Sequence, residues 1–294
     1  MKNILITGGA GFIGRYLAKV LSDEYNIHVY DLQFGMDIRN LHDLDKAFET
    51  TQCDTVIHLA ALVGVRRGND HMKDYMTTNI EGTWNIGKMC EKYNCRLISF
   101  SSSSVYGNAQ PPTSEDAPKN PLSFYGMTKL MGEHIVNRLN CPTVIIRPFT
   151  VYGEDGRADQ VFYKWLNQYK AGKPATVFTG SINKNGLGKR GYTYIGDIVN
   201  FIKTLVASTW ELNAAYHEDF NLGGEEIITT GDIIKIYKAL IPNMEFVLLP
   251  RPDIDVLENY ANISKAKTYF NFSAPPNFKL NIQRIIRKEL NINE

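Results

Sequence analysis

The chain has 294 residues, of which 44% are hydrophobic and 21% are charged, as is usual for a folded globular protein. Its 32 basic and 31 acidic side chains leave a net charge of +1, so the composition gives no electrostatic reason to expect binding to nucleic acid or to a membrane surface. The cysteines form no C-x-x-C pair and no histidine cluster has metal-ligand spacing, which favours reduced thiols, no metal site and a cytoplasmic location.

Short apolar runs alternate with amphipathic stretches through the first half of the chain. We expect strands at residues 3–7, 26–31, 55–59, 96–101 and 143–147, and helices at 12–24, 41–51, 75–93 and 124–139. This alternation is typical of βαβ units, and the continuous apolar run of residues 144–146 is typical of a parallel strand buried on both faces. The sequence therefore predicts an α/β protein with a Rossmann-type, doubly wound parallel sheet.

The pattern becomes looser in the second half. We expect helices at residues 160–171, 196–208, 229–240 and 282–290, and a glycine-rich stretch at 180–191. No apolar run reaches the roughly 18 residues that a membrane span needs. We predict a dinucleotide-binding domain at 1–149 with 192–240, and a smaller C-terminal substrate lobe at 150–191 with 241–294.

Three spaced glycines, Gly8, Gly11 and Gly14, lie between the first predicted strand and the first predicted helix, with Phe12 and Ile13 opening that helix. Such glycines permit a tight turn, a close approach of the backbone to a pyrophosphate, and tight packing of helix on strand. Free backbone N–H groups and the helix dipole then attract phosphate. We expect these five residues to bind a dinucleotide.

Asp31 closes the second predicted strand. A carboxylate at this place accepts hydrogen bonds from the adenosine ribose and repels a 2′-phosphate, which favours NAD over NADP as the cofactor. A helix-capping role is the alternative for Asp31. Asp37 and Ile38 precede the next helix and are candidates to contact the adenine, although Asp37 is equally well explained as a cap.

Tyr125 and Lys129 are one turn apart on a predicted helix, so both side chains lie on the same face. A second pair with this spacing, Tyr169 and Lys173, runs into Gly172 and Pro174, where a helix ends. Only Tyr125 follows a serine run, residues 101–104, at the carboxyl end of a predicted strand. Because open parallel sheets bind ligands at that edge, we assign Tyr125 and Lys129 to the catalytic site.

A free tyrosine, with a pKa of about 10, is a poor base at neutral pH. A nearby ammonium such as that of Lys129 and a positively charged nicotinamide both favour the phenolate form of Tyr125. Ser102 is expected to hold the substrate hydroxyl that loses its proton, which completes a Ser–Tyr–Lys set. The structural alternative for the serine run is a polar turn.

With these motifs, the chain resembles the extended short-chain dehydrogenases, the NAD-dependent epimerase/dehydratase family that modifies nucleotide sugars. The resemblance extends over nearly the whole chain, through residues 58–61, Asn79, 125–129, 147–153, 190–194, 221–224 and 264–266. It implies the fold predicted above, NAD as the cofactor and a homodimer. It adds these residues to the cofactor site: Leu59, Ala60, Ala61, Asn79, Ser101, Pro148 and Val151, beside Tyr125 and Lys129.

The serine run also bears on the reaction. Dehydratases of the family carry Asp and Glu at the third and fourth places of this run, and UDP-glucuronate decarboxylases keep the Glu. Here these places are Ser103 and Ser104, which supply no carboxyl acid or base. The resemblance therefore implies 4-epimerisation of a UDP-sugar through a transient 4-keto intermediate.

Among epimerases, the chain is most similar to UDP-glucuronate 4-epimerases, in Val65-Arg66 and in residues 147–157 and 171–174. In that group the serines, Thr150 and Arg157 surround the C5 carboxylate. A 4-keto uronate is a β-keto acid that loses carbon dioxide readily, and hydroxyls with a guanidinium can hold its carboxylate out of alignment. The resemblance gives this substrate site: Val65, Arg66, Ser102, Ser103, Ser104, Tyr125, Thr150, Arg157, Arg190 and Arg251.

Several alternatives remain open. Arg157 is also explained as a solvated charge, and Arg190 and Arg251, which match arginines that contact the diphosphate, as salt-bridge partners. Departures from the epimerase pattern, such as the short spacing from Asp31 to Asp37 and the altered segment 251–255, lie near the cofactor rim and the nucleotide pocket. A UDP-glucose 4-epimerase, a reductase of an NDP-4-keto sugar and a silent NAD-binding scaffold are the competing functions.

Overall fold

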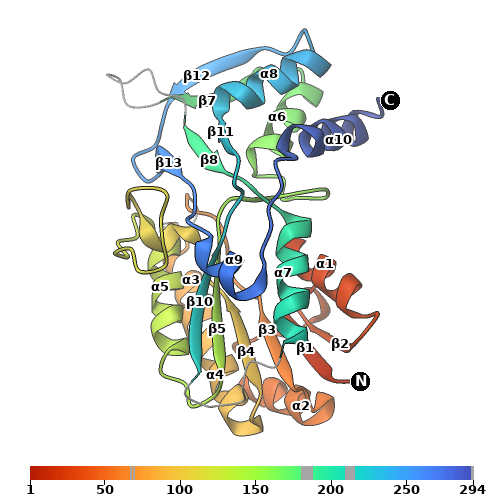
Figure 1. The fold of residues 1–294 in the computed structure, drawn as a ribbon, viewed down its shortest axis with the longest axis vertical. Coiled ribbons are helices and arrows are strands. Elements are labelled where there is room, and N and C mark those ends of the chain that lie inside the picture. The colour runs from red at the N-terminus through yellow and green to blue at the C-terminus, as the bar shows by residue number, and fades with distance from the viewer. Residues whose placement is uncertain (67, 69, 180–187, 209–215, 293–294) are drawn as a thin grey trace.

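The computed structural model describes residues 1–66, 68, 70–179, 188–208 and 216–292 (Figure 1). Six strands form one parallel sheet in the order β10-β5-β4-β3-β1-β2, so the chain reverses its winding direction beside β1. The α/β Rossmann-type class predicted from the sequence is confirmed. The strands are β1 (Asn3–Thr7), β2 (Asn26–Tyr30), β3 (Thr55–His58), β4 (Arg96–Phe100), β5 (Thr143–Pro148) and β10 (His217–Leu222).

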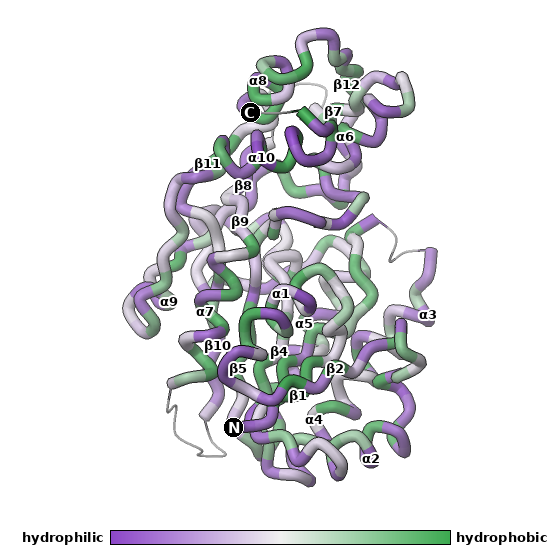
Figure 2. The backbone as a smooth tube through the Cα atoms, turned by 90° about the vertical axis from the view of Figure 1, so that its right-hand side faces the viewer, coloured by the Kyte–Doolittle hydropathy of each residue, from purple (hydrophilic) through white to green (hydrophobic). Residues whose placement is uncertain are grey.

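Helices cover both faces of the sheet because successive strand side chains point to opposite sides. Ile4 and Ile6 of β1 pack on the face covered by α1 (Phe12–Leu21) and α7 (Ile195–Ala207). Leu5, between them, packs on the face covered by α2 (Leu41–Thr51), α4 (Gly82–Tyr93) and α5 (Phe124–Val136). Figure 2 shows the hydrophobic colouring of β1 and β4 in this core.

The single helix expected at 75–93 is instead three consecutive segments. A short helix α3 (Met72–Tyr75) leads into a π-helical turn η2 (Met76–Glu81), and α4 follows. Gly82 lies at the junction of η2 and α4 and lets α4 pack closely against Ile38, in the segment after β2. A Cβ atom on residue 82 would lie 2.4 Å from Ile38 Cδ1. Apolar periodicity does not reveal the extra residue of a π turn, which explains why the prediction was wrong here.

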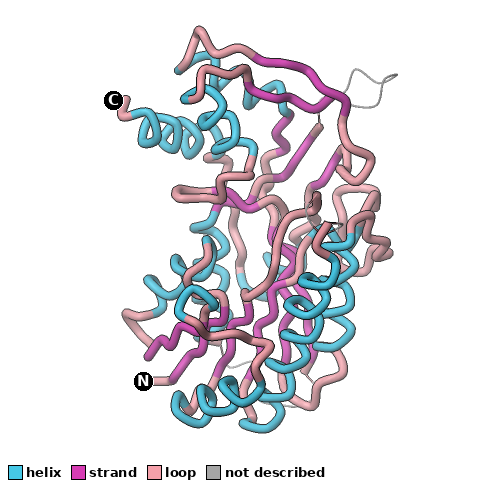
Figure 3. The backbone as a smooth tube through the Cα atoms, turned by 180° about the vertical axis from the view of Figure 1, so that it is seen from behind, coloured by secondary structure: helices cyan, strands magenta, loops and turns pink. Residues whose placement is uncertain are grey.

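A smaller lobe lies above the carboxyl edge of the sheet (Figures 1 and 3). It contains α6 (Val161–Lys170), α8 (Thr230–Leu240) and α10 (Phe278–Leu290), whose apolar faces share one aromatic-rich core with strand β7 (Ala175–Thr179). β12 (Phe246–Pro250) pairs in parallel with β7. Short strands link the lobe to the sheet: β6 (Val151–Tyr152), β8 (Lys189–Gly191), β9 (Thr193–Tyr194), β11 (Ile227–Thr229) and β13 (Glu258–Asn259).

Two segments pack differently from the expected domain division. We placed 229–240 with the sheet, but α8 buries Ile233 and Tyr237 in the lobe core. Conversely, α9 (Ser264–Phe270), which we placed in the lobe, packs Ala266 against the sheet-side core. Most of the glycine-rich stretch 180–191 lies outside the described residues. Within the described part, no helix is both long and apolar enough to span a membrane.

Candidate active site

A cavity of about 600 Å³ opens between the carboxyl edge of the sheet and the lobe. Parallel sheets place ligands at this edge. Its walls contain all the predicted site residues except three, Asn79, Arg66 and Arg251. The cavity-lining residues that we predicted are Gly8, Gly11, Phe12, Ile13, Gly14, Asp31, Asp37, Ile38, Leu59, Ala60, Ala61, Val65, Ser101, Ser102, Ser103, Ser104, Tyr125, Lys129, Pro148, Thr150, Val151, Arg157 and Arg190.

The glycine loop is packed so tightly that only glycine fits at two of its positions. Gly8 has φ of 70°, and a Cβ atom there would lie 2.6 Å from the backbone nitrogen of Ala60. A Cβ atom on Gly14 would lie 2.3 Å from the carbonyl oxygen of Gly8. Gly11, in contrast, precedes α1 and borders the cavity, where a phosphate can reach the helix N-terminus.

Asp31 caps a local turn and also reaches the glycine loop. Its carboxylate accepts hydrogen bonds from the backbone of Gln33, at the start of the 3₁₀ turn η1 (Leu32–Phe34), and from Ala10 N at 3.0 Å. The capping interpretation is confirmed, and the same carboxylate also lines the cavity, where the ribose contact stays a prediction. Asp37 is paired with Arg39, whose hydrogen bonds lower the pKa of Asp37.

Two buried polar networks fix the wall at residues 59–62. The His58 ring shares hydrogen bonds with Thr7 (2.7 Å) and Thr83 (3.1 Å), and burial lowers its pKa to about 3. Asn79 exchanges two hydrogen bonds with the backbone of Leu62, at 2.8 and 2.9 Å. Asn79, on the π turn, thus supports the loop that borders the cavity and does not itself line it.

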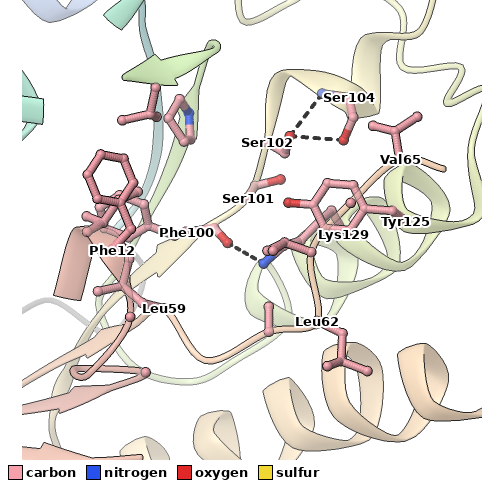
Figure 4. Close-up of a pocket in the computed structure, with 18 of the residues that line it drawn as sticks. Phe12, Leu59, Leu62, Val65, Phe100, Ser101, Ser102, Ser104, Tyr125 and Lys129 are labelled. Atoms are coloured by element: carbon pink, nitrogen blue, oxygen red, sulfur yellow. Dashed lines mark hydrogen bonds between the residues drawn. The ribbon is translucent and has the colours of Figure 1, made fainter. Parts of the chain in front are cut away.

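Tyr125 lies on the first turn of α5 with its ring 9% exposed. Burial raises the pKa of Tyr125, whereas its hydrogen bond with Ser102 and the nearby charge of Arg157 lower it. Ser102 Oγ accepts hydrogen bonds from the backbone N–H (3.2 Å) and the hydroxyl (2.9 Å) of Ser104, as Figure 4 shows. Since both Ser102 lone pairs are engaged, its own hydrogen is left to donate to Tyr125.

Lys129 lies one turn further along α5 and enters the cavity beside the end of β4. Its Nζ donates to the carbonyl oxygen of Phe100 at 2.8 Å (Figure 4). Burial lowers the pKa of Lys129 to about 8. Burial is the largest influence on the pKa of Tyr125, and it opposes the phenolate that we expect the Lys129 ammonium to favour.

The competing pair, Tyr169 and Lys173, lies elsewhere. Tyr169 is near the end of α6 and packs against the lobe core, and the helix ends before Gly172, which has φ of 66°. Neither residue lines the cavity. The context argument that separated the two pairs in the sequence thus agrees with their positions in the fold.

Ser103 and Ser104 begin a 3₁₀ turn, η3 (Ser103–Tyr106), at the cavity wall, whereas the Ser101 hydroxyl turns inward. Ser101 Oγ donates to Glu133 at 2.6 Å. Glu133 also forms a buried ion pair with Arg147, 2.7 Å from its Nε. Ser101, which directly follows β4, is therefore hydrogen-bonded to the buried ion pair of Glu133 and Arg147.

Arg157 borders the cavity near Thr150 and is close enough to Tyr125 to lower its pKa. Its Nε and Nη2 donate to the Asp159 carboxylate at 2.9 and 2.8 Å. This bidentate contact with Asp159 shows the geometry in which a guanidinium holds a carboxylate. Arg157 is 40% exposed, so the solvated-charge alternative is only partly excluded by its position.

A strap of residues 251–257 covers the far end of the cavity. Arg190 holds it, donating to the carbonyl oxygens of Val256 (2.7 Å) and Leu257 (2.8 Å). Burial is the largest influence on the pKa of Arg190 and lowers it, and the positive charge of Arg251 acts in the same direction. Arg66 forms a hydrogen-bonded ion pair with Asp255 of the strap.

Sequence reasoning missed several lining residues of the lobe side, among them Asp255, Asn259 and Gln160. The short altered motif around Asp255 was a signal, but no local pattern indicated Asn259. Gln160 Nε2 donates to the carbonyl oxygen of Val151, which fixes the strand beside the cavity. These residues reach the cavity only because the lobe folds back over the sheet.

A glycine loop open toward phosphate, an acid at the end of β2 and a Ser–Tyr–Lys set define a dinucleotide-dependent enzyme that acts on a hydroxyl group. A family model described as "NAD dependent epimerase/dehydratase family" matches residues 4–223. Because the match covers more than half of the chain, the protein belongs to this family, and its cofactor is NAD.

Relatives that are named as epimerases agree with this assignment. UDP-glucuronate 4-epimerase 2 of Arabidopsis thaliana is 30% identical over 97% of this chain and 75% of that protein. UDP-glucuronate 4-epimerase of Thermodesulfobacterium geofontis is 30% identical over 96% of this chain and 94% of that protein. The crystal structure of UDP-glucuronic acid 4-epimerase from Bacillus cereus, in complex with UDP-glucuronic acid and NAD, is 30% identical and superposes with a TM-score of 0.87, covering 99% of this chain and all of that one.

Proposed function

We propose that this protein is an NAD-dependent isomerase that interconverts UDP-glucuronate and its 4-epimer through a transient 4-keto sugar. The observation that carries the proposal is the juxtaposition of Ser102, Tyr125 and Arg157 around one cavity. The named relatives with this activity support it. Bound NAD accepts the hydride of sugar C4 and later returns it.

Tyr125 is the base that takes the proton of the 4-hydroxyl as its C4–H bond breaks, and the acid that returns this proton. Ser102, whose lone pairs are held by Ser104, donates toward the reacting oxygens and orients them. Lys129 contributes positive charge near Tyr125 when it is protonated. For epimerisation, the 4-keto sugar turns over and accepts the hydride on its opposite face.

The residues around the sugar oppose two side reactions. Ser103 and Ser104 supply no carboxyl group for the loss of water. Arg157 is proposed to bind the C5 carboxylate as it binds Asp159 in this structure, with Thr150 beside it. A carboxylate held in a fixed plane is kept out of alignment with the 4-keto carbonyl, which slows decarboxylation.

Other ligand contacts follow from position. Gly8, Gly11, Gly14, Asp31 and the other cavity-lining residues predicted for NAD are proposed to contact the dinucleotide. Arg190, which lines the cavity, and Arg251, at the start of the strap, are proposed to face the UDP diphosphate. Arg66 would act indirectly, by holding Asp255 of the strap.

We further propose that the protein is a homodimer and is located in the cytoplasm. Large apolar side chains on the outer faces of the π turn, α4 and α5 remain exposed: Met76, Trp84, Met127 and Met131. Met76 and Trp84 line a shallow apolar hollow together with Ile80 and Ile135, which a second copy of the same helices can fill. The four cysteines are buried free thiols, which is typical of a reducing compartment.

The function is tested by incubating the purified protein with UDP-glucuronate or UDP-glucose, without added cofactor, and identifying products by NMR. We expect conversion of UDP-glucuronate to its 4-epimer and retention of NAD through purification. Turnover of UDP-glucose alone would support a UDP-glucose 4-epimerase. A requirement for stoichiometric added reductant would contradict the proposal and favour a 4-keto-sugar reductase.

A further inference from the structure

One hydrogen bond connects the serine turn of the sheet domain with the lobe. Asn259 Nδ2 donates to Ser103 Oγ at 3.0 Å, between residues 156 positions apart in the chain. Ser103 is 8% exposed, and both residues line the cavity. Asn259 is the last residue of β13, where it pairs with Arg190 of β8. The position of the amide is thus set by a strand pairing of the lobe.

This bond determines where the hydrogen of Ser103 can lie. A hydroxyl group has one hydrogen and two lone pairs. Because the Asn259 N–H occupies the side of Ser103 Oγ that faces β13, the Ser103 hydrogen must point in another direction. Among the described residues, no group accepts a hydrogen bond from it, so the Ser103 hydroxyl remains available as a donor at the cavity wall.

Ser102 is fixed in the same way by a different partner. Its Oγ accepts from the backbone and hydroxyl of Ser104, so its own hydrogen is directed to the Tyr125 hydroxyl. The Ser103 hydroxyl, as a donor, and the Arg157 guanidinium border the same cavity. Such a set favours a group that only accepts hydrogen bonds, of which a carboxylate is the strongest example.

We propose that Asn259 is a positioning residue for substrate selection: by holding Ser103 as a hydrogen-bond donor, it favours sugars with a C5 carboxylate over sugars with a C5 hydroxymethyl group. The inference rests on the proposed function, because it assumes that the sugar occupies this part of the cavity. Asn259 acts through Ser103, so its effect depends on that hydroxyl.

The test compares four variants in a Tyr125→Phe background, which allows binding without turnover: the parent, Asn259→Asp, Ser103→Ala and the combination of the two. An aspartate at 259 accepts a hydrogen bond from Ser103 and so reverses its direction. Isothermal titration of the NAD-loaded proteins gives the ratio of the dissociation constants for UDP-glucuronate and UDP-glucose. Asn259→Ala, made in the same Tyr125→Phe background, is a second substitution at position 259 and adds no charge.

We expect Asn259→Asp to reduce the preference for UDP-glucuronate roughly 10- to 100-fold, the effect of losing one hydrogen bond to a charged group. Asn259→Ala, which frees the hydroxyl to rotate, should reduce the preference less. In the Ser103→Ala background, Asn259→Asp should have little further effect.

An undiminished effect of Asn259→Asp in the Ser103→Ala background would show direct repulsion of the carboxylate and overturn the inference. An unchanged preference in both Asn259 variants would overturn it as well. Failure of the proposed function looks different: the wild-type protein would then not convert UDP-glucuronate in the NMR assay, whatever the Asn259 variants do.

Discussion

Glu133 and Arg147 form a doubly hydrogen-bonded ion pair behind the catalytic serines, with contacts of 2.7 and 2.9 Å. Their side chains are only 4% and 1% exposed. The pair joins α5, which carries Tyr125, to β5, and Glu133 also accepts from Ser101 of β4. It therefore ties together the elements that meet at the active site.

Removing Arg147 leaves Glu133 buried without its ion-pair partner, whereas removing Glu133 leaves Arg147 still in contact with Asp219 at 2.6 Å. We predict that Arg147→Met lowers the free energy of unfolding by about 3–5 kcal/mol. The double variant Arg147→Met/Glu133→Leu should lose clearly less than the sum of the single changes. Urea denaturation followed by circular dichroism measures the free energy of unfolding of the single and double variants. Additive losses of this free energy would show that the pair is not coupled.

Tyr125→Phe removes the proposed acid and base while keeping the ring. We predict that kcat falls by about 10²- to 10⁴-fold, with the bound NAD content unchanged. Tyr169→Phe, at the other Tyr-x-x-x-Lys pattern, is the matched control and should keep full turnover. The assignment would be wrong if the two variants had equal activity.

Arg157→Ala tests the carboxylate contact. We predict that kcat/KM for UDP-glucuronate falls roughly 10- to 100-fold, because a charge-assisted hydrogen bond is lost, and that UDP-glucose turnover falls much less. Arg138→Ala, which removes an exposed arginine beyond α5, is the control. Equal losses with both sugars would contradict a role in carboxylate binding.

His58 gives the protein a predictable sensitivity to acid. Its folded pKa of about 3 lies below the ordinary histidine value of 6.5, so the unfolded chain binds more protons between these limits. Stability from this residue is fully present above pH 6.5 and is lost toward pH 3, at up to about 1.4 kcal/mol per pH unit. His58→Gln should reduce this slope in urea denaturation between pH 7 and 4, and an unchanged slope would show that His58 is not the cause.

Trp84→Glu tests the proposed dimer. We predict that the wild-type protein sediments as a dimer and that the charged variant sediments as a monomer, because Trp84 is 46% exposed beside the apolar hollow. Leu280→Glu, on the exposed face of α10, is the control and should leave the dimer intact. A wild-type monomer at micromolar concentration would remove this part of the proposal.

The glycine loop, Asp31 and the pair Tyr125 and Lys129 were predictable because each leaves a local signal. A turn needs glycine within a few residues, and a helix brings positions four apart onto one face. The parallel sheet was predictable for the same reason, since its buried strands are short apolar runs. The π turn was not, because one additional residue within a helical turn barely alters the apolar pattern.

The sequence by itself determined the class of fold, the glycine loop and which of the two Tyr-x-x-x-Lys pairs lies at the cavity, since these depend on residues close together in the chain. Only the tertiary structure decided that Asn259 reaches Ser103, that Arg66 holds Asp255 and that α8 belongs to the lobe. The first two contacts join residues 156 and 189 positions apart, and their geometry depends on how the lobe packs over the sheet.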